Sequence, residues 1–289
     1  VGNLSGNGSI QANGGGSGNG SGGGGGRIAI HYSKDLSLPE QNISAIGGTG
    51  YYGSPGGNGT VFFKHQSQEY GHLIIDGFGR SSPSDTTRIP GGYIFDDMTV
   101  RNAARVVADE GLQVRGALRL SGNSIITHGR VNESGLTIDA NFIEIDAGSS
   151  LDATGRGYRG GTEYKEQGYT LGNVPGASIG AGGSYGGLAS GHEGRTSNPI
   201  YGSLTNPLDL GSGGGAWEHE DGGYGGGLVR IHADSMILNG SILANGGESS
   251  GSAAGDGSGG TVNISVGNLS GDGSIQANGG GSGNGSGGG

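Results

Sequence analysis

The stretch VGNLSGDGSIQANGGGSGNGSGGG, residues 266–289, decides the fold because it repeats the first residues of the chain. Residues 1–24 read VGNLSGNGSIQANGGGSGNGSGGG, and the two copies differ only where Asp272 replaces Asn7. Position 266 thus corresponds to position 1, which sets a 265-residue period. A long match at a fixed offset indicates a tandem-repeat architecture. We therefore expect one 265-residue unit followed by the start of the next.

A shorter repeat, with a 33-residue period, runs inside this unit. Short alternating stretches follow pairs of glycines, as in RIAIH (27–31), TVFFK (60–64), LVRIH (228–232) and TVNIS (261–265). Such alternation between glycine and asparagine breakers predicts β-strands. A second apolar strand usually follows after 13 residues, as from Val61 to Ile74 and from Val229 to Ile242. Apolar positions recur with the 33-residue period at Ile10 and Ile43, at Ile28, Val61 and Ile94, at Val229 and Val262, at Ile231 and Ile264, and at Ile242 and Ile275.

Apolar stripes at a fixed offset predict an all-β fold, a parallel β-helix (β-solenoid) with glycine-rich loops. Between residues 93 and 154 the spacing falls to a 20-residue interval, in Leu118 and Ile138, Ile125 and Ile145, and Val131 and Leu151. We interpret this spacing as the minimal rung, to which the 33-residue rung adds a loop. The predicted rungs are thus about 20 and about 33 residues long.

Three regions follow from this pattern: β-solenoid rungs over 1–154, an insertion over 155–227, and further rungs over 228–289 that continue into the next unit. The insertion lacks strand alternation and holds six of the eleven tyrosines and the only tryptophan. Long insertions of this kind are either functional or simple loops, and both readings stay open. In the first, aromatic rings form a contact surface: Tyr158, Tyr164, Tyr169, Tyr185, Tyr201, Trp217 and Tyr224.

The glycine run GGGSGNGSGGGGG at 14–26 also allows two interpretations. A flexible surface loop is favoured, since Gly/Ser tracts behave as coil. The alternative is an extended polyglycine segment that hydrogen-bonds to neighbouring copies.

Asparagine is predicted to have a structural role at the corners that end equivalent strands. Asn13, Asn245 and Asn278 each precede a Gly-Gly pair, and we expect their side chains to stack on, or bond to, the adjacent rung. Ten N-x-Ser/Thr sequons are candidate glycosylation sites: Asn3, Asn7, Asn19, Asn42, Asn58, Asn132, Asn239, Asn263, Asn268 and Asn284.

Composition excludes several classes of function. The net charge of −10 argues against nucleic acid or an anionic membrane as partner. No apolar run approaches the roughly 18 residues of a membrane span. The chain has no cysteine, which removes disulfides and thiolate metal sites. No phosphate-loop motif occurs, and we expect no cofactor.

Signals for catalysis or metal binding are weak, and we expect no enzyme. The acidic neighbours Asp96 and Asp97, and Asp109 and Glu110, point to opposite faces of a strand. Glu144 and Asp146 are able to share an outward face, and Asp139 lies nearby. Metal sites are conceivable at Glu218-His219-Glu220-Asp221 beside Trp217, and at Gly255–Gly260, which only partly matches a calcium nonapeptide. His31 and His232 close equivalent strands.

The units GGRIAIHY…ISAIGG, GGNGTVFFKH…HLIIDG and GGTVNISV…GSIQANGG resemble those of glycine-rich right-handed parallel β-helix proteins of microbial surfaces, such as large adhesins and filament-forming repeat proteins. The resemblance covers most of the chain outside 155–227. It implies an extracellular or cell-surface structural subunit that associates with itself head to tail, and that adheres to glycans or other surface molecules. The alternatives are a polysaccharide-active β-helix enzyme and a glycan-binding module.

Overall fold

The computed structural model describes residues 1–50, 54–80, 86–163, 166–191 and 194–281. Within these residues the fold is mostly β, with one short 3₁₀ turn at Glu40–Asn42 and no α-helix. None of the described segments forms a helix that is long and apolar enough to cross a membrane.

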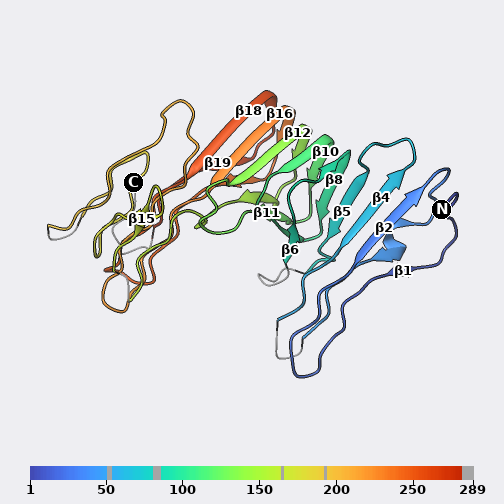
Figure 1. The fold of residues 1–289 in the computed structure, drawn as a ribbon, viewed down its shortest axis with the longest axis horizontal. Helices are drawn as coiled ribbons and strands as arrows, with labels where there is room; N and C mark the ends of the chain where they lie inside the picture. The colour runs from blue at the N-terminus through green and yellow to red at the C-terminus, as the bar shows by residue number, and fades with distance from the viewer. Residues whose placement is uncertain (51–53, 81–85, 164–165, 192–193, 282–289) are drawn as a thin grey trace.

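One long sheet runs through the molecule (Figure 1). Eight strands follow one another across it in chain order, and the short strand β7 (Ile94–Phe95) pairs with β10 beside this path. The eight strands are β2 (Arg27–Tyr32), β4 (Thr60–His65), β5 (His72–Asp76), β8 (Asp97–Arg101), β10 (Leu112–Leu120), β12 (Leu136–Ile145), β16 (Leu228–Leu238) and β18 (Thr261–Ser270).

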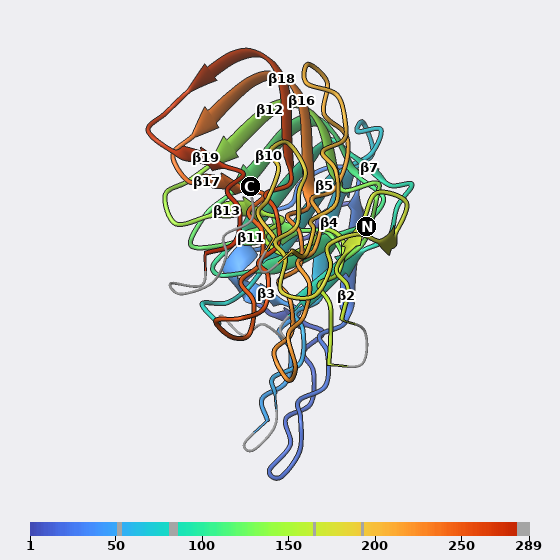
Figure 2. The same ribbon diagram turned by 90° about the vertical axis from the view of Figure 1, so that its left-hand side faces the viewer.

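A second wall faces the long sheet (Figure 2). It comprises β6 (Thr86–Ile89), β9 (Arg105–Ala108), β11 (Ile125–Thr127), β13 (Ser150–Asp152), β17 (Ser241–Leu243) and β19 (Ser274–Gln276). Near the N-terminus the corresponding pair is β1 (Ile10–Gln11) and β3 (Ile43–Ser44). Outside β4–β5 and β7–β8, whose strands both lie in the long sheet, the chain passes alternately through the two walls, so a typical rung contributes one strand to each. These long parallel sheets of consecutive strands are consistent with a β-solenoid.

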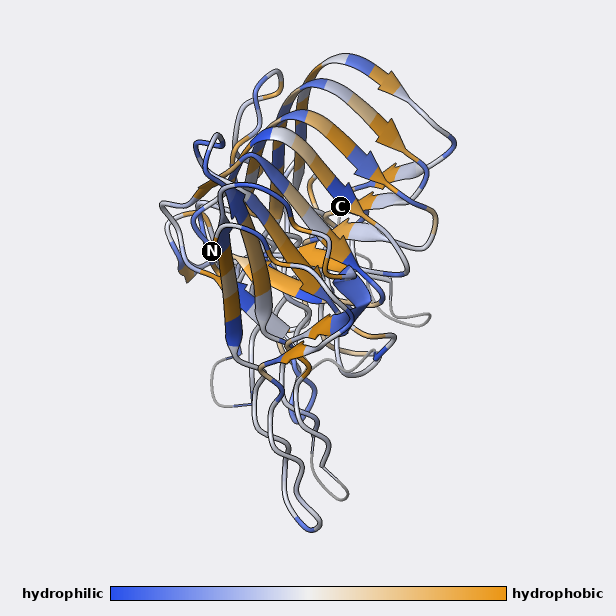
Figure 3. Ribbon diagram, turned by 90° about the vertical axis from the view of Figure 1, so that its right-hand side faces the viewer, coloured by the Kyte–Doolittle hydropathy of each residue, from blue (hydrophilic) through white to orange (hydrophobic). Residues whose placement is uncertain are grey.

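Alternation along each strand creates the core between the walls. In β10 the side chains of Leu118 and Leu120 are buried and that of Arg119 is exposed. The same two-residue period colours the strands in Figure 3. Parallel register then stacks apolar on apolar, for example Leu118 on Ile143 and Ile143 on Met236.

The 33-residue spacing predicts most of the strand partners correctly. Ile28 pairs with Val61, Ile231 with Ile264, and Ile242 with Ile275. Ile10 pairs with Ile43 in the same way. These positions are direct neighbours in adjacent rungs, which confirms the period at both ends of the chain.

The 20-residue pairs are wrong as assigned. Leu118 pairs with Met98 on one side and with Ile143 on the other, so the two intervals differ (118 − 98 = 20 against 143 − 118 = 25). Ile138 faces Leu112 instead of Leu118, and Ile125 faces Ser150 instead of Ile145. A 20-residue interval does occur between β8 and β10. The interval from the second half of β10 to β12 is 25 residues because the connecting loop is longer.

The interval from Val61 to Ile74 is also misread by the sequence pattern. These residues do not lie on successive walls; β4 and β5 form an antiparallel hairpin within the long sheet, with Val61 opposite Ile74. Gly71, with φ +90°, lies in the turn, a conformation that favours glycine. Ile94 consequently does not continue the row of Ile28 and Val61, and it pairs with Gln113.

The core changes sides of the long sheet at this hairpin. Val61, Phe63 and Ile74 belong to a small apolar cluster with Ile28 and Ile30. Leu73 and Ile75 belong instead to the large cluster that extends along the sheet to β16, and Phe62 packs against it. Both faces of β5 are therefore buried, with Ile74 4% and Ile75 0% exposed. The sheet is shared by two cores on opposite faces.

The glycine run at 14–26 forms an ordered hairpin, the second of the two alternatives. Gly23 donates its backbone N–H to Gly15 O (2.9 Å) within the hairpin. Gly48 donates to Gly23 O (2.7 Å), and Gly56 to Gly48 O (3.0 Å), in the next hairpin of the stack. Side chains would prevent this approach, because a Cβ on Gly22 or Gly48 would overlap a backbone carbonyl of the neighbouring hairpin.

Residues 155–227 are likewise not a structureless loop. They contain a short antiparallel pair, β14 (Tyr169–Thr170) and β15 (Val174–Pro175), together with extended glycine segments. Backbone bonds recur at every third position: Tyr158 and Gly161 donate to Gly211 and Gly214, and Gly222 and Gly225 donate back to Gly161 and Tyr158. A period of three is that of an extended polyproline-II-type helix. We call this segment the glycine lobe.

Substitution of two adjacent residues tests the change of core side. We expect Ile74→Ala and Ile75→Ala each to lower the free energy of unfolding by about 2–5 kcal/mol, because each leaves a cavity in a different buried cluster. Gln113→Ala, at an exposed position of β10, is the control and should change it by less than about 0.5 kcal/mol. Chemical denaturation measures all three. A neutral Ile74→Ala beside a costly Ile75→Ala would contradict two cores on one strand.

Candidate functional site

The acidic residues that are adjacent in the sequence accept hydrogen bonds from backbone N–H groups. Asp96 accepts N–H bonds from Gly71 (2.6 Å) and Tyr70 (3.2 Å), and so fixes the β4–β5 turn. Asp97 accepts the N–H of Ala117 (2.8 Å) across the sheet. Asp109 accepts that of Gly129 (2.6 Å) and also contacts Arg88. Carboxylates bound in this way act as structural acceptors.

Glu144 lies on the outward face of the long sheet, as predicted from its position, and forms an ion pair with Arg119 (3.3 Å). Further along this face a groove of about 390 Å³ includes Arg115, Asp139, His232 and Asp234 among its lining residues. Asp139 and His232 approach to 3.8 Å. Arg115, Asp139, His232 and Asp234 are exposed to solvent, so the groove lacks the enclosed setting that is typical of a catalytic site.

The candidate metal ligands are dispersed. Glu220 binds the backbone N–H groups of Ala253 (2.8 Å) and Ala254 (3.1 Å). Asp221 accepts the N–H of Glu163, and Asp256 accepts that of Ser249 (2.7 Å). Across the described ranges, no three histidine, aspartate or glutamate side chains converge on one point.

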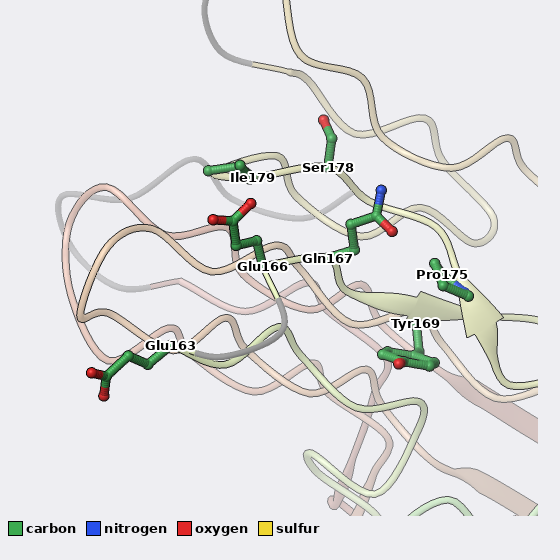
Figure 4. Close-up of a pocket in the computed structure, with 7 residues that line it drawn as sticks. All are labelled: Glu163, Glu166, Gln167, Tyr169, Pro175, Ser178 and Ile179. Atoms are coloured by element: carbon green, nitrogen blue, oxygen red, sulfur yellow. The ribbon is translucent and has the colours of Figure 1, made fainter.

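A depression of about 550 Å³ lies on the glycine lobe. Its lining residues include Glu163, Glu166, Gln167 and Tyr169. Figure 4 shows the two carboxylates pointing in different directions, away from the ring of Tyr169. Glu163 lies 3.5 Å from His219. The polar groups do not converge as they would around one reacting atom or one small ligand.

Two of the aromatic residues predicted as a contact surface, Tyr158 and Tyr185, are buried inside the lobe. Tyr158 and Tyr185 are 1% and 7% exposed, and their hydroxyls bond to Glu133 (2.8 Å) and Thr261 (2.7 Å). Their rings have no surface for a partner, which corrects the contact prediction for these two residues.

The other described aromatic residues of that prediction are half-buried. Tyr201 packs on Tyr185, with ring centroids 4.9 Å apart. Guanidinium groups stack on the other three rings, Arg159 on Tyr169 (3.8 Å), Arg195 on Trp217 (3.9 Å) and Arg130 on Tyr224 (4.5 Å). Tyr164 lies outside the described residues. For Tyr169, Tyr201, Trp217 and Tyr224, and for Tyr164, the role as a contact surface stays a prediction.

Aliphatic side chains, which the sequence pattern did not single out, form the apolar surface of the lobe. Leu204 is 97% exposed, and several others on the lobe are exposed as well. These are Leu171, Val174, Leu188, Ile200 and Leu208. In the sequence, the segment 198–210 contains prolines and leucines without strand alternation, and this feature could have indicated part of the exposed apolar surface.

Two of the three corner asparagines bond to the next rung. Asn13 Oδ1 accepts the N–H of Ile46 (2.8 Å), and Asn245 Oδ1 accepts that of Asn278 (2.8 Å). Asn278 is exposed at the outer edge of the last rung.

The sequons differ in accessibility. Asn58 is buried and accepts the N–H of Gly47 (3.0 Å), so it is shielded from a glycosyltransferase in the folded chain. The amide of Asn263 bonds to Asn206 and Pro207, and that of Asn132 bonds to Asp109 O. Asn284 lies outside the described residues. Asn3, Asn7, Asn19, Asn239 and Asn268 are exposed and Asn42 is half-buried; their modification stays a prediction.

The two copies of the repeated segment occupy different edges of the structure. In the first copy Ile10 pairs with Ile43, and Ala12 donates to Ser44 O (2.8 Å) on the following rung. In the second copy Ile275 pairs with Ile242, on the preceding rung. Leu269 and Ile275 are 50% and 44% exposed, whereas their equivalents Leu4 and Ile10 are partly buried against the small core. Each copy thus has a neighbour on the side where the other has none among the described residues.

A buried histidine fastens the glycine lobe to the sheets. His128 Nδ1 lies 2.7 Å from Gly129 O, and Nε2 accepts the N–H of Leu228 (3.3 Å), where the chain returns from the lobe. This pattern requires the neutral imidazole with its proton on Nδ1. Burial lowers the pKa of His128 to about 4.

Comparison of the chain with known protein families, curated proteins and solved structures finds no match.

The glycine lobe provides a matched pair of substitutions. A Cβ on Gly225 would overlap the carbonyl oxygen of Gly211, whereas one on Gly186 would meet no atom within 4 Å. We expect Gly225→Ala to destabilise the chain by about 3 kcal/mol and Gly186→Ala to be nearly neutral. Thermal unfolding measures both. Equal effects would mean that close backbone contact does not hold the lobe together.

Acidification tests the role of His128. Its folded-state pKa is about 4, below the ordinary 6.5, so the unfolded chain binds the proton first. The stabilising contribution is complete above pH 6.5 and declines by about 3 kcal/mol towards pH 4. We expect His128→Gln to destabilise the chain at pH 7 and this difference from wild type to shrink towards pH 4. A pH-independent difference would contradict the neutral, buried histidine.

Proposed function

We propose that this chain is one unit of a β-solenoid made by tandem repetition, and that the array is a structural, adhesive filament or appendage outside the cell. The observation that carries the proposal is the repeated segment, whose two copies have complementary sets of neighbours. Superimposing residues 1–16 on 266–281 gives one rung that is bonded on both sides. A continuing chain would need only one copy of this rung at each junction.

The corner asparagines support this junction. Asn245 bonds to Asn278, which corresponds to Asn13, and Asn13 in turn bonds to Ile46. The backbone follows the same order, because Ala244 donates to Gln276 O (2.8 Å) and Ala12 donates to Ser44 O (2.8 Å). The ladder therefore continues from the last rung of one unit into the first rungs of the next without a change of register.

Hydrogen bonds at the edge of the long sheet also support a continuous junction between units. Val1 N donates to His31 O (2.7 Å) and Ser33 N donates to Val1 O (3.1 Å), which places Val1 beside Tyr32. Val1 corresponds to Val266 in β18. Counting back from Val266, Val262 and Ile264 of a preceding unit would lie beside Ile28 and Ile30. Those four side chains face the core in both strands.

An open sheet edge at each end also favours assembly with another copy. Unpaired N–H and C=O groups along β2 and β18 would be satisfied by pairing with each other. The contact is heterologous, since one end of the unit meets the opposite end of the next, and such contacts generate open fibres. The exposed aliphatic residues of the glycine lobe would then provide the adhesive contacts, with the sheets as spacer.

Enzymatic function is less well supported. The acidic groups that lie close together are bonded to backbone N–H groups or to arginine, and the groove around Asp139 and Asp234 is open to solvent. A polysaccharide-binding role for this groove would be compatible with the filament, because a repeated unit repeats the groove.

Rod length tests the proposal. Chains of one, two and three complete units, each ending with the segment 266–289, are compared by electron microscopy. Each unit adds eight strands to the long sheet, so we expect an increment of about 38 Å at the usual strand spacing of about 4.8 Å. Separate particles joined at variable angles would contradict a continuous solenoid.

A further inference from the structure

We infer that consecutive units in the array are related by about half a turn around its axis, so that the glycine lobes project alternately from opposite sides. This inference rests on the proposed tandem assembly and adds the geometry of the filament.

The first step is the reversal of strand direction. β4 and β5 are antiparallel, whereas every other pair of neighbours in the described long sheet is parallel. β2 and β4 therefore run one way, and the six strands from β5 to β18 run the other way. The reversal occurs once per 265-residue unit.

The second step is the simultaneous change of core side. Val61 and Ile74 face the small core, and Phe62 and Ile75 face the large one. Reversal of the strands together with transfer of the core to the opposite face preserves the hand of the winding. Both blocks can therefore wind with the one hand that parallel crossover connections strongly prefer.

The third step concerns the junction between two units, across which neither the strand direction nor the side of the core changes. Val1 runs parallel to the end of β2, as the bonds to His31 and Ser33 require, so β18 of one unit would run parallel to β2 of the next. The apolar residues of both strands face one core, and β19 becomes β1 in the opposite wall. A following unit thus starts with the strand direction and core side at which its predecessor ended.

Together these steps fix the relation between neighbours. Each unit starts with strand direction and core side both inverted relative to the start of the previous unit. A rotation of half a turn about the array axis inverts both at once. The true structural repeat is then two units, about 77 Å for sixteen strands at a spacing of about 4.8 Å, with any twist of the sheet added to the half turn.

The glycine lobe makes the alternation measurable. It is inserted between β13 and β16, and both of these strands contribute side chains to the large core, so the lobe changes sides with that core from unit to unit. Exposed residues on the lobe, such as Leu204, would then face two opposite directions along the filament. A filament of this kind is able to bridge two surfaces, whereas one with all lobes on one side would coat a single surface.

The test uses the 289-residue chain preceded by two further complete units. Because the chain has no cysteine, Leu204→Cys in chosen units gives single attachment sites for paired distance labels. We expect the first and third labels to be at least about 77 Å apart, because twist of the sheet can only add a lateral offset to this axial rise. We expect the first and second to be well over half of that distance, because the width of the array adds to the axial rise of about 38 Å.

As a control, a pair of labels is attached at Arg119→Cys in the same two units. Arg119 lies on the outer face of the long sheet, so these labels report the axial rise close to the sheet. If this control gives about 38–45 Å between adjacent units but the Leu204 labels of adjacent units lie only about 38 Å apart, the lobes are on one side and the half-turn is wrong. A broad distribution at Arg119 would instead refute the continuous array itself.

Discussion

Backbone hydrogen bonding between successive rungs is the interaction on which this structure depends. With 30% of residues hydrophobic and 74 glycines, the chain has few side chains with which to build a thick core. The ladder also runs through bonds between glycines, which have no side chains, as in Gly48 to Gly23 and Gly222 to Gly161. Glycine is required there because backbone carbonyls occupy the space where a Cβ would be. The glycine-rich composition is therefore a packing requirement, and buried polar backbone groups remain paired.

The hairpin at β4 and β5 sets the architecture above the level of the rung. One antiparallel pair in an otherwise parallel described sheet exchanges the core between faces, and Asp96 fixes the turn that makes this possible. Ile74 and Ile75 pack into different clusters as a result. Two short solenoid-like blocks thus share one sheet, which joins them more rigidly than a linker would.

The sequence predicts the features that depend on side-chain periodicity. Most of the 33-residue pairs are correct because both strands of a rung alternate, and Asn245 and Asn278 recur at the same interval; the pair Val61 and Ile94 fails because the β4–β5 hairpin intervenes. The 20-residue pairs fail since loop length varies between 20- and 25-residue rungs, and several leucines and isoleucines fit either register. The hairpin is missed because a 13-residue interval suits both a corner, as from Val229 to Ile242, and a reversal, as from Val61 to Ile74. The glycine lobe is missed because backbone-to-backbone packing leaves no hydrophobic pattern. Its tyrosines fit a contact surface by composition, although Tyr158 and Tyr185 are needed inside it.

Hydrogen exchange at the repeated rung tests the central claim that both ends of the unit are halves of one junction. In the first copy the N–H groups of Ala12 and Gly14 donate to Ser44 and Ile46. The equivalent amides of Ala277 and Gly279 would acquire those bonds only when another unit follows. We predict that exchange at Ala277 and Gly279 slows by at least about 100-fold when a second unit follows, equivalent to about 2.7 kcal/mol of protection. Gly280, already bonded to Gly257 (2.8 Å), should change much less. Unchanged exchange at Ala277 and Gly279 would contradict the continuous junction.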